Sequence, residues 1–233
     1  MKYPCLTVVF FSLVIISCTR KREVPLYEVN FINNQCIKVD GTSDDHAWGR
    51  AIILKDFLLP WENDKPQLTI FRALYDTSNL YIFFQAMDHN MVIKDSIRNE
   101  IDISKEDRVE LFISKNKTMD EYFCIEIDPL GRVLDYRASY YRKFDDKWNI
   151  DGILVGSKIY PESYQVEFSI PLKSLIKMGV NISEDFYVGL FRADLENSVS
   201  GLKENWLSWV DPKTPEPDFH VPQALGLFHF NYK

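Results

Sequence analysis

The stretch that decides the fold is QLTIFRALYDTSNLYIFFQAM, residues 67–87. Two runs rich in aromatic and β-branched residues, 67–75 and 80–87, flank the polar sequence Asp76-Thr77-Ser78-Asn79. Aromatic and β-branched residues favour strands, whereas Asp, Ser and Asn favour turns. The segment is therefore predicted to form a β-hairpin.

Residues 108–114 (RVELFIS) show the same strand signal as a strict alternation. Val109, Leu111 and Ile113 are predicted on one face of this strand. Arg108 and Glu110 are predicted on the other face. Because successive side chains of a strand point to opposite faces, the first set is expected in the core and the second outside it.

Short strand signals separated by turn residues continue to the end of the chain. Further strands are predicted at residues 122–127, 132–138, 164–170, 186–193 and 225–230. Helix is scarce, with short helical segments predicted only at 171–178, which opens with a proline, and at 44–49. The predicted fold is all-β, an antiparallel β-sandwich with one or two short helices.

The amino terminus has the features of an export signal. Lys2 precedes the apolar run 6–16, which is too short to span a bilayer because a spanning helix needs about 20 apolar residues. Ser17-Cys18 then resembles a bacterial lipobox, in which the cysteine becomes the lipidated first residue. We expect a lipoprotein signal peptide at 1–17, a lipidated tether at 18–35 and one domain at 36–233. An ordinary secretory signal cut nearby and an uncleaved anchor remain alternatives.

The charge balance and the cysteines narrow the classes of partner and of metal site that the chain could have. The chain has 27 Lys and Arg against 34 Asp and Glu, a net charge of −7, which argues against binding nucleic acid. After removal of the signal, Cys36 and Cys124 would be the cysteines left besides Cys18. They would either form a disulfide or remain two free thiols, and their spacing matches no metal framework.

Seven stretches in one order make the prediction more specific. They are VDGTSDDHAWGRA (39–51), ALYDTSNLYIFFQAMD (73–88), EDRVELFIS (106–114), YFCIEIDPLGRVLD (122–135), YQVEFSIPLKSL (164–175), YVGLFRAD (187–194) and WVDP…DFHVPQALGLFHF (209–230). In this order they resemble a family 9 carbohydrate-binding module, a DOMON-like β-sandwich, and its lipoprotein branch in particular. The resemblance runs from about residue 37 to residue 230.

The resemblance implies a sugar site lined by polar and aromatic residues. Glu110, Glu126 and Arg192 fall on positions whose side chains would hold sugar hydroxyls. Studied members clamp a terminal sugar between two tryptophans, and those positions are Ser104 and Phe219 in this chain. One stacking wall is thus absent, and the other is a smaller ring.

Two further site residues are expected. Trp206 and Trp209 have opposite parity, so one should face the core and the other the site, and Trp209 is the predicted site residue. Asp88 falls where the family binds structural calcium, although no D-x-D-x-D-G loop supports that metal independently.

These expectations combine into one predicted function. The chain is expected to be a non-catalytic glycan-binding lipoprotein of the bacterial cell envelope, held on the outer membrane by its lipid. It would support polysaccharide capture or degradation beside glycoside hydrolases. A structural or protein-interaction lipoprotein on the same fold is the alternative. A glycoside hydrolase ranks lower, because carboxylates paired with an arginine should lack the raised pKa that a general acid needs.

Overall fold

The computed structural model describes residues 24–33, 37–94, 96, 98–199 and 201–232. The strands are β1 (Leu26–Phe31), β2 (Thr69–Tyr75), β3 (Asn79–Met87), β4 (Arg108–Ser114), β5 (Tyr122–Ile127), β6 (Val133–Ser139), β7 (Lys143–Asp145), β8 (Leu154–Tyr160), β9 (Ser163–Pro171), β10 (Phe186–Ser198), β11 (Gly201–Ser208) and β12 (Gly226–Asn231). One short α-helix, α1 (Leu172–Lys177), and three 3₁₀ helices, η1 (His46–Arg50), η2 (Glu100–Lys105) and η3 (Pro222–Ala224), complete the described elements.

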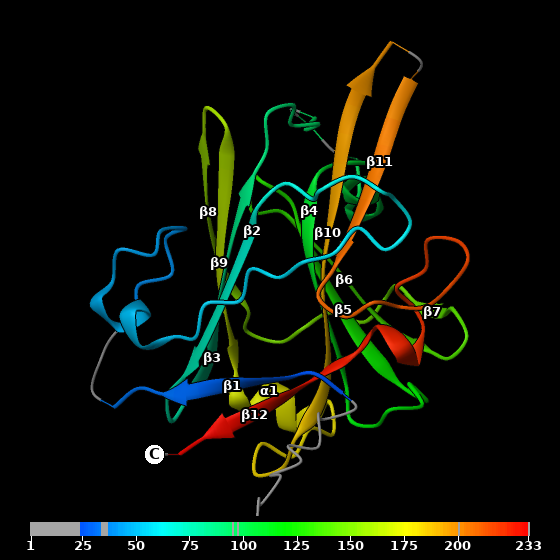
Figure 1. Cartoon of the computed structure of the whole chain (residues 1–233). Coiled ribbons are helices and arrows are strands. Elements are labelled where there is room, and N and C mark those ends of the chain that lie inside the picture. The colour runs from blue at the N-terminus through cyan, green and yellow to red at the C-terminus, as the bar shows by residue number, and fades with distance from the viewer. Residues whose placement is uncertain (1–23, 34–36, 95, 97, 200, 233) are drawn as a thin grey trace, which may run out of the picture.

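The strands form one curled sheet that packs against itself as a sandwich. Their order is β7-β6-β5-β4-β10-β12-β1-β2-β3-β9-β8, and β11 pairs with β10 outside this path. Figure 1 shows β8, β9, β3 and β2 on one side, β4, β5, β6 and β10 on the other, and β1 and β12 crossing between them at one end. The predicted β-sandwich is confirmed. The pairings of β1 with β12 and β2 are parallel, so the sheet is mixed instead of wholly antiparallel.

Strand β1 corrects one expected boundary. Residues 18–35 were predicted to be a tether, but Leu26–Phe31 is a strand in register with β12 from Leu26↔Leu227 to Asn30↔Asn231. The buried side chains of Tyr27 and Val29 join the core. The domain therefore begins before residue 36. Cys18 and Cys36 lie outside the described residues, and Cys124 is buried.

The deciding hairpin folds as predicted. β2 and β3 pair antiparallel, and the Asp76 carboxylate accepts hydrogen bonds from the backbone N–H groups of Ser78 and Asn79, both at 2.7 Å. This is the local turn chemistry for which Asp is favoured. Alternate residues of β3, Leu80, Ile82 and Phe84, then enter the core.

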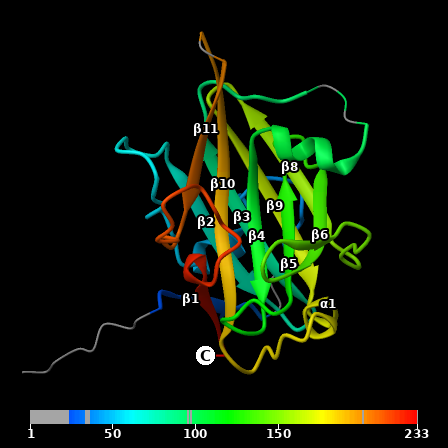
Figure 2. The ribbon, with the colours of Figure 1, turned by 90° about the vertical axis from the view of Figure 1, so that its right-hand side faces the viewer.

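The main core fills the space between the two layers. On β4, Val109, Leu111 and Ile113 all point into it, as their parity predicts. The other face of β4 carries Arg108, Glu110 and Phe112, which are also buried, because η2 and the 209–225 segment cover that face (Figure 2). This outer face of β4 and β5 is where the functional site lies.

Four strands escaped prediction: β1, β7, β8 and β11. β10 also runs beyond its predicted end to Ser198 and pairs with β11 as a hairpin that projects from the body (Figure 1). Much of β8 and β11 is exposed, so neither has the apolar alternation of a core strand. Among the residues that the structure describes, no helix is long and apolar enough to cross a membrane.

Candidate functional site

The floor of the site is a buried group of charges on neighbouring strands. Glu110 of β4 lies directly opposite Glu126 of β5 in the antiparallel register, so their side chains share one face. Arg108 shares that face because it lies two residues before Glu110. All three side chains are almost fully buried. A buried charge of one sign needs an opposite charge beside it, and the sequence supplies the partner from the same strand.

One guanidinium holds both carboxylates. Arg108 Nη2 lies 3.0 Å from Glu110 Oε1, and Arg108 Nε donates to Glu126 Oε2 at 2.6 Å. Arg108 Nη1 donates to the backbone carbonyls of Ser104 and Glu106, at 3.0 and 3.2 Å. The remaining oxygen of Glu126 accepts a hydrogen bond from the hydroxyl of Tyr136 at 2.8 Å. The floor is therefore a fixed array of donors and acceptors.

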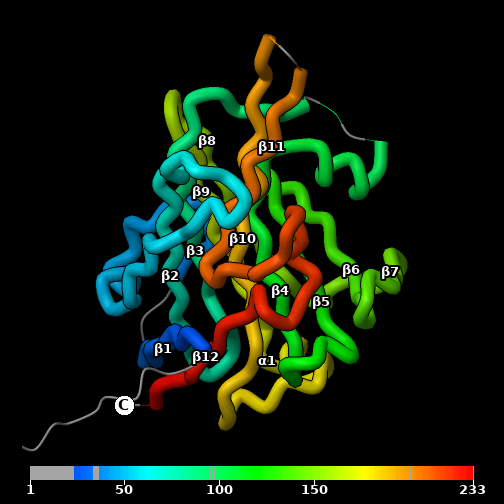
Figure 3. Tube along the Cα trace, turned by 45° about the vertical axis from the view of Figure 1, so that its right-hand side comes forward, coloured from blue at the N-terminus to red at the C-terminus, as the bar shows by residue number. Residues whose placement is uncertain are grey.

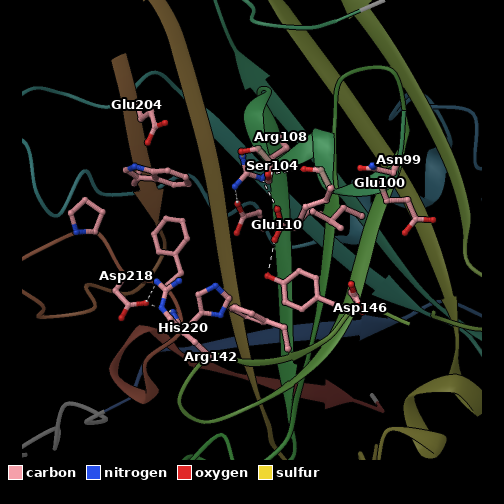
Figure 4. Close-up of a pocket in the computed structure, with 18 residues that line it drawn as sticks. Asn99, Glu100, Ser104, Arg108, Glu110, Arg142, Asp146, Glu204, Asp218 and His220 are labelled. Carbon is pink, nitrogen blue, oxygen red and sulfur yellow. Dashed lines mark hydrogen bonds and ion pairs between the residues drawn. The ribbon is translucent and has the colours of Figure 1, made fainter. Parts of the chain in front are cut away.

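A pocket of about 1170 Å³ opens above this array. Figure 4 shows Arg108 and Glu110 at its centre, between Glu204 on one side and Asn99, Glu100 and Asp146 on the other. Pockets of this size exceed the ~300–1,000 Å³ that usually suits a drug-sized ligand. The pocket has room for more than one small ring.

An aromatic wall stands on one side of the pocket. Trp206 of β11 is half-buried, and its ring meets Phe219 edge-on, with ring centroids 5.7 Å apart. Phe219 is 6% exposed and stacks at 4.1 Å on Phe191, whose own ring covers Gly189. The guanidinium carbon of Arg108 lies 5.4 Å from the centre of the Trp206 ring. Trp206 is thus the more accessible ring, and Phe219 supports it from behind.

Another part of the lining combines rings with an ion pair. Tyr136 and Phe144 meet edge-on at 5.4 Å, and Phe144 meets His220 at 5.3 Å. Arg142 donates to Asp218 at 2.7 Å. Both Phe144 and Arg142 are exposed, so this side of the pocket is open to solvent.

Burial changes the proton affinity of two side chains here. It raises the pKa of Glu110 to about 8, helped by the neighbouring charge of Glu126, while Arg108 acts in the opposite direction but does not prevail. The expectation that an arginine would prevent a raised pKa is therefore wrong for Glu110. Burial also lowers the pKa of His220 to about 4, so that imidazole is neutral at physiological pH.

The pocket brings together three of the predicted site residues. Glu110, Glu126 and Phe219 all line it, and so does Ser104, which leaves no aromatic ring at its own position. Ile101, one turn away on η2, is exposed at the rim instead.

Arg192 and Trp209 do not lie where the sequence predicted them. β10 pairs with β4 so that Arg192 lies opposite Val109, a core position, and Arg192 is fully buried between the layers. Trp209 belongs to the main core, where its ring packs against Gly226 of β12. Neither side chain lines the pocket. The prediction that they contact a ligand there is wrong, because each points to the opposite side of its strand or loop.

Arg192 instead belongs to a second buried group of charges. Its Nη2 atom lies 3.1 Å from Asp88 Oδ2 and 2.5 Å from Asp194 Oδ1. Carboxylate oxygens of Asp88, Asp107 and Asp194 lie within 4.8 Å of one another, and all three residues are buried. One guanidinium does not balance three carboxylates, and hard oxygen donors are what calcium prefers. This cluster could therefore hold a cation, and its donors fit the calcium predicted at Asp88.

The pocket residues that the sequence prediction missed include Arg108 and Trp206. Arg108 had the correct parity with Glu110, and that spacing of two could have identified it. Trp206 was the other member of a pair from which Trp209 was chosen. Trp61 and Trp148 lie apart from the floor: Trp61 packs on Phe219, and Trp148 packs on Phe123 beside the main core.

Comparisons with known proteins agree with this fold. The family model described as "Carbohydrate family 9 binding domain-like" matches residues 39–231. No curated protein matches the chain. A candidate carbohydrate-binding protein from Bacteroides uniformis superposes with a TM-score of 0.68 at 15% identity, covering 89% of this chain and 100% of that one.

A family 9 carbohydrate-binding module from Caldicellulosiruptor kristjanssonii is similar in two structures. In complex with glucose it gives a TM-score of 0.61 at 14% identity, covering 89% of this chain and 96% of that one. In complex with cellotriose it gives a TM-score of 0.60 at 13% identity, covering 89% of this chain and 94% of that one. At these identities the structures establish a shared fold, whereas the family model covers most of the chain. The chain therefore belongs to the carbohydrate family 9 binding domain-like family.

Proposed function

We propose that the pocket above Arg108, Glu110 and Glu126 binds a saccharide without breaking it down. The observation that carries this proposal is a half-buried tryptophan, Trp206, beside a buried array of charged hydrogen-bonding groups. Sugars present apolar C–H faces that stack on aromatic rings, and their hydroxyls pair with carboxylates and guanidinium groups through charge-assisted hydrogen bonds. Both kinds of contact are available within one pocket.

The size of the pocket supports an oligosaccharide. Its volume of about 1170 Å³ exceeds what one sugar ring needs, and the open side at Phe144 and Arg142 lets a chain extend. The related module from Caldicellulosiruptor kristjanssonii is described in complex with both glucose and cellotriose. We therefore propose that a short stretch of a polysaccharide is the ligand.

Glycoside hydrolysis is the second candidate, because Glu110 has the raised pKa of a general acid. The geometry weighs against it. Arg108 contacts Glu110 at 3.0 Å and Glu126 at 2.6 Å, so its guanidinium lies where a scissile bond would have to enter between two catalytic carboxylates. Release of reducing sugar by the purified protein alone would favour this candidate.

A binding assay tests the proposal. The protein beginning at residue 19 is passed over a glycan array and over affinity gels that contain soluble polysaccharides. We expect retention of at least one saccharide, and weaker retention for the variants Glu110→Ala and Trp206→Ala. Melting temperature checks that each variant is folded. If no saccharide is retained across a broad panel, the proposal is wrong, and a protein-interaction role on this fold takes its place.

We also propose that the protein works on the bacterial cell envelope, anchored by a lipid on Cys18, close to glycoside hydrolases that use the same polysaccharide. Ser17-Cys18 after an apolar run supports the anchor. The variant Cys18→Ala should move the protein from the membrane fraction to the soluble fraction. Retention of this variant on membranes would mean that something other than lipidation holds it.

A further inference from the structure

The pocket has more negative than positive groups. Its described lining contains six carboxylates, Glu100, Glu110, Glu126, Asp146, Glu204 and Asp218, but only two guanidinium groups, Arg108 and Arg142. The neutral His220 adds no charge. Because the pKa of Glu110 is about 8, that carboxyl is protonated near neutral pH, and the other five carboxylates leave the lining with an excess of three negative charges.

Local ion pairs account for only half of these carboxylates. Arg108 contacts Glu110 and Glu126, and Arg142 contacts Asp218. Glu100, Asp146 and Glu204 form no ion pair with any residue that the structure describes. All three are exposed at the pocket, where a ligand could reach them.

The uncompensated carboxylates lie on two sides of the pocket. Figure 4 shows Glu204 on one side, and Glu100 and Asp146 on the other. A ligand on the floor therefore experiences negative potential from both sides. Charges that line a concave site with low-dielectric walls concentrate their field within it.

The floor also holds a buried acceptor that lacks a hydrogen bond. Glu110 is 2% exposed, and its Oε1 atom contacts Arg108 as an ion pair but accepts no hydrogen bond with acceptable geometry from the described residues. A buried acceptor without a hydrogen bond costs free energy unless a partner arrives. A ligand donor that reached this oxygen would satisfy it.

We propose that the preferred ligand of this pocket is a saccharide that carries protonated amines, such as a polymer of de-acetylated amino sugars. This inference rests on the proposed function and names its ligand class. An ammonium group has three donors and a positive charge, so it can pair with Glu204, Asp146 or Glu100 and donate toward Glu110. From these carboxylates a neutral sugar gains only hydrogen bonds, and a sugar carboxylate is repelled by the same field.

The test compares three β-1,4-linked trimers that differ mainly at one substituent: cellotriose, triglucosamine and its fully N-acetylated form. Affinities are measured by calorimetry at about pH 6, where primary amines are protonated and exposed carboxylates are ionised. Each exposed ion pair raises affinity about two- to fivefold. We therefore expect triglucosamine to bind about tenfold more tightly than cellotriose or the N-acetylated trimer. Raising the salt from about 50 to about 500 mM should reduce this preference.

Substitutions test whether the carboxylates of the pocket cause the preference for triglucosamine. The double variant Glu204→Gln, Asp146→Asn should reduce the preference to about twofold, whereas Asp64→Asn, an exposed acid outside the pocket, should leave it unchanged. If cellotriose binds as tightly as triglucosamine, or a glucuronate-bearing oligosaccharide binds better, this inference fails while the proposed function stands. If no saccharide of any class binds, both fail.

Discussion

Glu110 of β4 lies directly opposite Glu126 of β5, and a single guanidinium, that of Arg108, contacts both carboxylates. Directly opposed residues have Cβ atoms about 5 Å apart, so two unpaired carboxylates would repel each other strongly in this buried position. Arg108 therefore has two roles. It compensates the charges of the floor, and it fixes the orientation of the acceptors that face the pocket.

Removing this arginine should destabilise the domain. Arg108→Met leaves the buried carboxylate of Glu126, and the carboxyl of Glu110 beside it, without their cation, and breaking a buried ion pair costs about 3–5 kcal/mol. Denaturant unfolding measures the loss. The matched control is Arg137→Met, which removes an exposed arginine that pairs with Glu121 and Asp145 and should cost at most about 1 kcal/mol. Equal costs for the two variants would contradict the structural role of Arg108.

The raised pKa of Glu110 should make stability depend on pH. Its pKa is about 8 in the folded protein and near 4.3 when unfolded, so the folded state holds the proton more tightly. The stability that this proton provides is present at low pH and is lost as pH rises from about 5 to about 9. Arg108, Glu126 and Tyr136 face this carboxyl.

Glu110→Gln removes that titration, because an amide cannot ionise. Its free energy of unfolding should therefore decline less between about pH 5 and about pH 9 than that of the wild type. His220, with a pKa of about 4, does not titrate in this window. Parallel pH profiles of the two proteins would show that Glu110 is not the group responsible.

The sequence predicted which side chains share a face but not which surface each face meets. Alternation within β4 correctly separated Val109 and Leu111 from Arg108 and Glu110. The placement of Arg192 came from the family resemblance and was wrong. Its side chain shares the face of Val188 and Leu190, which the register with β4 turns toward the core. β1 was missed for a related reason. Its six residues pair only with distant β2 and β12.

The aromatic wall gives a direct prediction for binding. Trp206→Ala should weaken saccharide affinity at least about tenfold, because buried tryptophans dominate the energy of binding sites. Trp209→Phe changes a core ring that does not line the pocket, so it should lower stability while affinity stays within about twofold. Calorimetry with the retained saccharide measures both. A larger affinity loss for Trp209→Phe would mean that the assignment of the two rings is reversed.

The aspartate cluster predicts a response to calcium. About 5 mM CaCl₂ lies above the dissociation constants of many extracellular sites, so it should raise the melting temperature by about 2–4 °C or more. Asp107→Asn removes one of the three clustered carboxylates and should abolish the rise. Magnesium, which prefers a stricter octahedral shell, is the control ion. A rise that persists in Asp107→Asn would place the calcium elsewhere.

The close approach of Gly226 and Trp209 predicts that position 226 does not tolerate a side chain. A Cβ atom at Gly226 would lie 2.3 Å from Cζ3 and 2.5 Å from Cη2 of the Trp209 ring, which is far inside normal contact. Gly226→Ala should therefore cost about 1–3 kcal/mol or more, because the ring is buried and cannot move away freely.

A matched pair of variants tests this cause. At Gly49 an added Cβ would meet nothing within 4 Å, so Gly49→Ala should be neutral or slightly stabilising. Combining Gly226→Ala with Trp209→Leu should cost less than the sum of the two single changes, since the smaller side chain leaves room for the methyl group. Strict additivity in denaturant unfolding would show that the cost of Gly226→Ala arises from the backbone of β12. Rescue would instead confirm that the ring of Trp209 is held in the core by the absence of a side chain at residue 226.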